Sequence, residues 1–164
     1  VYKYSSINNK QLMLIASKNQ IDHNGGYVNN WTTKEFSDYV LSKDKKGMVL
    51  MARDHGGPWQ NPIEVNEAFG LRKAMSSAKQ SFTEDIECGF QAVHIDTSID
   101  PYDDSLSIDE ALYRCFELYE HCWAVSQKTG NQILFEIGTE EQSGTTNTPE
   151  QLSHTLDKIF LCVI

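Results

Sequence analysis

The chain has 164 residues, of which 14 are basic and 23 acidic, so its net charge is -9. The isoelectric point is about 4.9. This charge argues against nucleic acid or an anionic membrane as a partner, because both attract a basic surface. Apolar residues make up 40% of the chain, as in ordinary globular proteins, and no apolar run approaches the roughly 20 residues of a membrane span.

The first elements that the sequence predicts are four short, nearly continuous apolar stretches. They are LMLIAS (12–17), MVLMAR (48–53), AVHIDT (92–97) and ILFEIG (133–138). Half-exposed antiparallel strands would alternate with polar residues, whereas parallel strands are apolar on both faces. We therefore expect four buried parallel strands.

Helical patterns follow each of these strands. Thr32 begins a capping box ahead of one helix, and Ser107 begins another ahead of a long helix that Gly130 ends. Residues 63–88 form a further helical stretch with a candidate break near Ser81. Thr148 and the proline after it open the last helix.

The order is β-α-β-α-β-α-β-α, which predicts an α/β fold with a parallel sheet. Two architectures fit, an open doubly wound sheet or part of a TIM-type (β/α)8 barrel. No GxGxxG or phosphate loop follows any strand, which weakens the nucleotide-binding form of the open sheet. A complete barrel needs about 250 residues. In the barrel alternative, residues 1–164 are one partial domain and a segment of a longer chain.

Polar residues gather where the predicted strands end, and in parallel α/β folds this edge carries the active site. The second strand leads into Asp54 and His55, the third into Asp96, and the fourth contains Glu136 and leads to Glu140. A histidine with two or three carboxylates suits a divalent ion such as zinc, manganese or magnesium.

Each of these residues also has a structural explanation. Asp96 alone is more simply a turn former or helix cap. His55 would then be a surface loop residue, His94 a hydrogen-bonded core histidine, and Glu140 part of a solvated acidic pair. The first strand also leads into polar residues, Ser17 to Gln20, and the coincidence of four such strand ends favours a site.

Four motifs in these regions point to a family. They are SKNQIDHNGGY (17–27), DHGGPWQ (54–60), GFQAVHIDTS (89–98) and EIGTE (136–140). In order and spacing they resemble the accessory subunit family of class II tagatose-bisphosphate aldolases, the GatZ/KbaZ-like proteins. The resemblance spans residues 12–160 and covers the first half of a longer family chain.

The resemblance implies a fold and a site, because this family is related to metal-dependent class II aldolases, which are (β/α)8 barrels. By it, Asp54 matches the general acid/base, His55 a metal ligand and Asp96 an acid near the metal. Catalytic aldolases carry a further metal-site glutamate where this chain has Gly138.

We therefore expect a divalent ion, zinc in the first place. The expected metal ligands are His55, Asp96 and Glu136, the expected catalytic residue is Asp54, and the expected substrate-binding residues are Asn19, Ser98 and Glu140.

Three functions follow from these expectations. The first is a metal-dependent aldolase, or a C4-epimerase using the same retro-aldol chemistry, acting on a ketose or ketose phosphate. The second is a non-enzymatic subunit that stabilises a catalytic aldolase, which the missing acid at Gly138 favours. The third and weakest is the tagatose-6-phosphate kinase activity ascribed to some family members, since no kinase signature is present. We also expect an oligomer, and a cytoplasmic protein because its four cysteines form no CxxC pair.

Overall fold

The fold was analysed in a computed structural model, which describes residues 1–138 and 148–163. The strands are β1 (Leu12–Ser17), β2 (Val49–Gly56), β3 (Ala92–Asp96) and β4 (Leu134–Gly138). The helices are α1 (Tyr2–Asn8), α2 (Thr33–Lys43), α3 (Pro62–Asn66), α4 (Leu71–Glu87), α5 (Ile108–Thr129) and α6 (Pro149–Val163).

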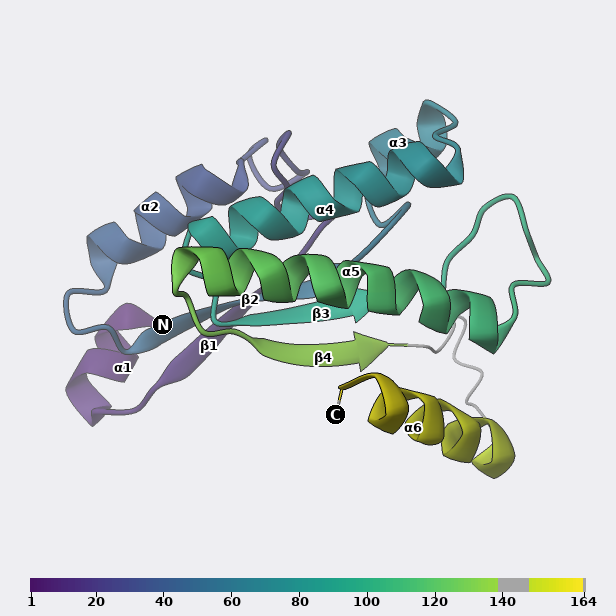
Figure 1. The fold of residues 1–164 in the computed structure, drawn as a ribbon. Helices are drawn as coiled ribbons and strands as arrows, with labels where there is room; N and C mark the ends of the chain where they lie inside the picture. Colours follow the sequence, from purple (N-terminus) through teal and green to yellow (C-terminus); the bar gives the residue numbers. More distant parts are fainter. Residues whose placement is uncertain (139–147, 164) are drawn as a thin grey trace.

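The four strands form one parallel sheet in the order β1-β2-β3-β4. Figure 1 shows α2, α4 and α5 side by side over one face of this sheet. A doubly wound sheet reverses its strand order and carries helices on both faces. The parallel α/β prediction is thus confirmed, and the sequential order is that of neighbouring (β/α) barrel units. That these units belong to a closed barrel stays a prediction.

The core lies between the sheet and its helices. Phe82 and Ile86 from α4 pack on Val93 and Ile95 from β3, together with Leu118 from α5. A second cluster joins α2 to β2 around the buried side chains of Val40, Val49, Met51 and Phe90. Alternate residues of the strands therefore face the helices, which leaves the intervening residues for the opposite face.

That opposite face of the sheet carries exposed apolar side chains at its two edge strands. Ile15 on β1 is 59% exposed and Leu134 on β4 is 70% exposed. These residues alternate along their strands with residues that pack on the helices. In a closed barrel this face is filled by side chains from the other strands.

The expected helix ends are largely confirmed. Thr32 and Glu35 form the complete capping box, and Gly130 ends α5 in the left-handed conformation with φ 75°. Ser107 accepts a hydrogen bond from the backbone N–H of Glu110, but the Glu110 carboxylate bonds Arg114 instead of reaching back to the cap. The reciprocal hydrogen bond from the Glu110 carboxylate to the cap residue is therefore missing, and this second capping box is incomplete.

Two helical features differ from expectation. The break in the stretch 63–88 lies between α3 and α4, where Ala68 has a positive φ of 51° and Gly70 caps α4. Ser81 lies inside α4 and is buried, so the break expected there is wrong. The short helix α1 was not expected; Ser5 fixes it by donating a hydrogen bond to the carbonyl of Lys10.

The thiols of α5 are buried and free. Cys115 and Cys122 form no disulfide, and burial raises the pKa of Cys115 to about 12. In the part of the chain that the structure describes, no helix is both long and apolar enough to cross a membrane.

Candidate functional site

A bulge at the end of β2 places two consecutive polar side chains at the edge of the sheet. Arg53 pairs with Val93, but the next paired residue, Gly56, lies opposite Ile95, so β2 has one residue more than β3 here. His55 in this bulge has a positive φ of 42°. In a regular strand the side chains of Asp54 and His55 would point to opposite faces of the sheet. The bulge turns one of them, so that both lie at the same edge.

The glycines after the bulge are needed for space. The backbone of Gly56 and Gly57 has no positive φ, and the left-handed conformation in this segment is at His55. A Cβ on Gly56 would lie 2.5 Å from the Phe82 ring, and one on Gly57 would overlap the backbone oxygen of Asp96. The glycines therefore let the loop after β2 lie directly on α4 and β3.

Asp54, His55 and His94 form the centre of the site. One ligand atom of each lies within 4.8 Å of the other two. His94 Nδ1 is 3.4 Å from Asp54 Oδ1, His55 Nε2 is 3.8 Å from the same oxygen, and the two imidazole rings are 5.0 Å apart. All three side chains are partly exposed, so a small molecule can reach them.

Asp96 lies beneath this cluster and is 2% exposed. Its Oδ2 is 2.7 Å from His55 Nδ1 and 2.9 Å from Gln60 Nε2. Its Oδ1 accepts hydrogen bonds from the backbone N–H and hydroxyl of Ser98. The structure thus brings Asp54, His55, Asp96 and Ser98 together, while the roles expected of them stay predictions.

The remaining expected residues lie at the margin or outside the described residues. Asn19 and His55 line the same open hollow of about 420 Å³ above the strand ends. Glu136 is exposed on β4, and its Cα pairs with that of His94; among the described residues it is not one of the three clustered ligands. Glu140 falls outside the described residues.

Residues 2–160 match the family described as D-tagatose-1,6-bisphosphate aldolase subunit GatZ/KbaZ-like. The chain belongs to this family.

A solved structure supports the same fold for this GatZ/KbaZ-like chain. The chain is similar to the crystal structure of a probable tagatose 6 phosphate kinase from Sinorhizobium meliloti 1021, with a TM-score of 0.76 and 21% identity. The match covers 95% of this chain and 38% of that one. At this identity the likeness concerns the fold, and the chain spans well under half the length of that protein.

His94 is the site residue that sequence reasoning missed. Its simplest interpretation was a core histidine, although strand alternation already placed it on the same face as Asp96. The structure also shows what makes room for it, because a Cβ on Gly138 would overlap His94 Nε2. A glycine facing a histidine on the neighbouring strand was the available signal.

Beside the site, buried charged groups fix the loops that follow β1 and β2. Arg53 makes a two-pronged ion pair with Asp85 and donates hydrogen bonds to the carbonyls of Ala16 and Ile21. Burial alone would lower the pKa of Arg53, but the charge and hydrogen bonds of Asp85, together with the charges of Asp22 and Asp54, outweigh this effect and raise that pKa. These residues support the site and do not face it.

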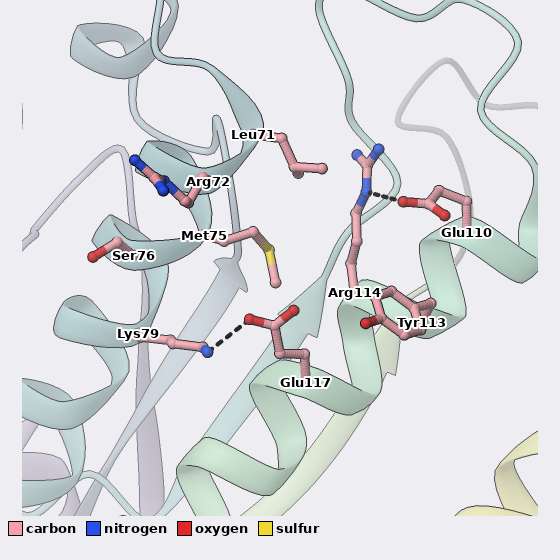
Figure 2. A pocket seen from close by; sticks show the side chains of 9 residues that line it. All are labelled: Leu71, Arg72, Met75, Ser76, Lys79, Glu110, Tyr113, Arg114 and Glu117. Atoms are coloured by element: carbon pink, nitrogen blue, oxygen red, sulfur yellow. Dashed lines mark hydrogen bonds and ion pairs between the residues drawn. The ribbon is translucent and has the colours of Figure 1, made fainter.

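A second hollow, of about 380 Å³, lies on the helical side between α4 and α5 (Figure 2). Arg72 lines the hollow, and its other charged groups pair with one another: Lys79 with Glu117 at 2.7 Å, and Arg114 with Glu110 at 3.2 Å. Arg114 also pairs with Asp100. Because these charges are already compensated, we place the site at the strand ends and not in this groove.

Proposed function

We propose that this chain carries part of the active site of a metal-dependent, class II aldolase-like protein that acts on a ketose or ketose phosphate. The observation that carries the proposal is the cluster of Asp54, His55 and His94 at the carboxyl ends of β2 and β3. Family membership supports the substrate class, since the family is described as a subunit of D-tagatose-1,6-bisphosphate aldolase.

The donor set fits a divalent ion of the zinc type. Imidazoles are common zinc ligands, so His55 and His94 would hold the ion beside Asp54, and zinc sites that do chemistry leave a position open for substrate. Asp54 and His55 have side chains that are 42% and 39% exposed, which suits such an open site. Glu136 on β4 would add a further oxygen ligand next to His94. When bound, the ion would polarise the substrate carbonyl.

Protein side chains would carry out the proton transfer and the binding of the substrate. Asp54 takes the proton from the C4 hydroxyl, whose oxygen becomes the carbonyl of the leaving aldehyde. The C3–C4 bond breaks and its electron pair stays on C3, which lies next to the ketose carbonyl. The proton taken from the C4 hydroxyl then returns to C3, so that the products are an aldehyde and a ketone. Asn19 and Ser98, at the margin of the site, bind the sugar hydroxyls, as does Glu140. Re-forming the bond on the opposite face of the aldehyde gives C4 epimerisation with the same residues.

A second candidate function is that of a stabilising subunit for a separate catalytic aldolase. The specific observation for it is Gly138, which supplies no carboxylate where catalytic aldolases carry one. His94 Nε2 occupies the space beside Gly138. The His94 imidazole would therefore serve as a ligand in place of the missing carboxylate. We therefore favour chemistry at this site, with assembly on a catalytic subunit as the alternative.

Phosphoryl transfer is the least favoured function, although the similar solved protein is described as a probable kinase. Kinases and related enzymes hold phosphates with glycine-rich loops and a lysine. The sequence has no such loop after any of its strands.

The test is carbon–carbon bond cleavage by the full-length protein, with a panel of ketoses and ketose phosphates, alone and with a class II aldolase subunit. We expect aldehyde release that stops on chelation, returns with a divalent ion, and is lost in Asp54→Asn, which retains its metal. Activity equal in wild type and Asp54→Asn would refute the proposed role of Asp54. Activity seen only in the added subunit would support the accessory function.

A further inference from the structure

Asp96 has hydrogen-bond donors at both of its oxygens. His55 and Gln60 contact Oδ2, at 2.7 and 2.9 Å, and the backbone N–H and hydroxyl of Ser98 contact Oδ1, at 3.0 and 2.6 Å. A carboxylate offers about four acceptor positions. With four donors in place in a buried site, Asp96 has little capacity left for binding a metal directly.

The two ring nitrogens of His55 face different neighbours. Nδ1 faces Asp96, whereas Nε2 faces Asp54, at 3.8 Å. A carboxylate that accepts a hydrogen bond from one ring nitrogen fixes the hydrogen there, so that the lone pair of the other nitrogen is the one that can bind a metal. The arrangement therefore turns the metal-binding nitrogen of His55 toward Asp54 and the His94 ring.

Gln60 is placed to hold Asp96 in this position. It is 9% exposed, and the residue before it, Trp59, is fixed because its backbone N–H donates to the buried Glu64 carboxylate. The Gln60 amide donates to the same Asp96 oxygen that meets His55. Gly57, pressed against the backbone of Asp96, brings this loop close enough for the contact.

We propose that Asp96 and Gln60 are a positioning pair: Gln60 holds Asp96, and Asp96 keeps the hydrogen of His55 on Nδ1, so that Nε2 is presented to the ion. This inference rests on the proposed metal site and gives Asp96 a different role from the direct ligand expected from sequence. His55 needs such a partner because its backbone is strained and its side chain is 39% exposed.

The first test measures zinc affinity of the full-length protein by competition with a chromophoric chelator. Mutation of a residue that orients a metal ligand typically costs 10–100-fold in affinity, so we expect a loss of that size in Asp96→Asn and of about tenfold in Gln60→Ala. The matched control is Gln91→Ala, because the Gln91 side chain bonds the backbone N–H of Met51 at the opposite end of the sheet. That control should remain within about twofold of wild type.

The second test measures the His55 tautomer in the metal-free protein from its ring nitrogen chemical shifts. We expect the hydrogen on Nδ1 in wild type and in Gln91→Ala, and a mixture of tautomers in Asp96→Asn. A wild-type His55 with its hydrogen on Nε2, or zinc affinities within twofold of wild type in both Asp96→Asn and Gln60→Ala, would overturn the inference. Should Asp96→Asn not fold, Gln60→Ala and the wild-type tautomer decide.

These readouts separate this inference from the proposed function. If the protein binds zinc as expected but cleaves no ketose, the positioning pair stands and the enzymatic proposal fails. If wild type binds no divalent ion, the proposed metal site fails, and the tautomer measurement still shows whether Asp96 fixes His55.

Discussion

Gly138 shows how the absence of a side chain shapes this site. A Cβ there would lie 2.3 Å from His94 Nε2, and the neighbouring ring atoms would be 3.2 and 3.4 Å away. His94 therefore occupies the space over β4 that a larger residue at 138 would fill. The ring is held in that position between Gly138 and Asp54.

We predict that Gly138→Ala displaces His94. Forcing an added methyl against a packed ring typically costs about 1–3 kcal/mol, and the displaced imidazole should also weaken metal binding. Urea unfolding and zinc affinity of the full-length protein measure the two effects. The control is Gly70→Ala, since a Cβ at Gly70 meets nothing within 4 Å; equal behaviour of the two variants would argue against the steric role of Gly138.

The sequence predicted part of the site well and part of it poorly, for physical reasons. Asp54 and His55 were visible because an acid and an imidazole rarely end an apolar strand by chance. His94 was not, since a histidine inside a strand has the same pattern whether it faces a core or a site. The role of Asp96 depends on Gln60 and His55, which approach it only in the folded chain.

At the scale of elements, β2 joins the site to the core. Its bulge turns Asp54 and His55 to the strand-end site, and the residue just before them, Arg53, is fully buried with Asp85 of α4. The predicted strand ended at Arg53, whereas β2 continues to Gly56. Local apolar periodicity could not show this extension, because the bulge is defined by its register with β3.

We predict that Arg53→Met strongly destabilises the fold. Removing one member of a buried ion pair leaves an uncompensated charge, here on Asp85, and typically costs about 3–5 kcal/mol. The control is Lys34→Met, which breaks an exposed pair with Asp38 and should change stability little. Free energies of unfolding from urea titrations decide this, and similar values for both variants would contradict the anchoring role.

A second element, the loop after β1, should make the free energy of unfolding depend on pH. Burial alone would raise the pKa of Asp22, but hydrogen bonds from His23 and Asn61 and the charge of Lys18 hold it well below its ordinary 3.8. A carboxylate with a lowered pKa stabilises the fold above its unfolded pKa, and this contribution is lost as the pH falls below that value.

We therefore expect Asp22→Asn to be less stable than wild type at pH 7, by the order of 2 kcal/mol. This difference should shrink as the pH falls below about 4. Urea unfolding of both proteins between pH 7 and pH 3 provides the measurement. A difference that stays constant over this range would show that ionisation of Asp22 does not contribute.

For the whole molecule, the decisive feature is a sheet with helices on one face and apolar residues exposed on the other. The sequence predicted the parallel order because each strand is apolar and each helix has its own cap. It left the doubly wound alternative open, since apolar patterns do not reveal which face of a sheet a helix covers. The strand order and the position of α2, α4 and α5 favour barrel units (Figure 1).

We predict that a polypeptide of residues 1–164 alone does not unfold as a cooperative monomer. Among the residues that the structure describes, the edge strands β1 and β4 pair on one side only, and Met13, Ile15 and Leu134 are exposed. Unpaired edges and open apolar faces promote association. Urea unfolding with sedimentation at several concentrations checks this, and one concentration-independent, cooperative transition of a monomer would disprove it.

The central claim is that His55 and His94 bind a divalent ion beside Asp54, and metal content of the purified full-length protein tests it most directly. Wild type, His55→Ala, His94→Ala and the control His154→Ala, an exposed histidine paired with Asp109 on α5, would be measured after dialysis against zinc. We predict bound zinc in wild type and His154→Ala and a large loss in the other two variants. Equal metal content in all four proteins, or none in wild type, would contradict the account.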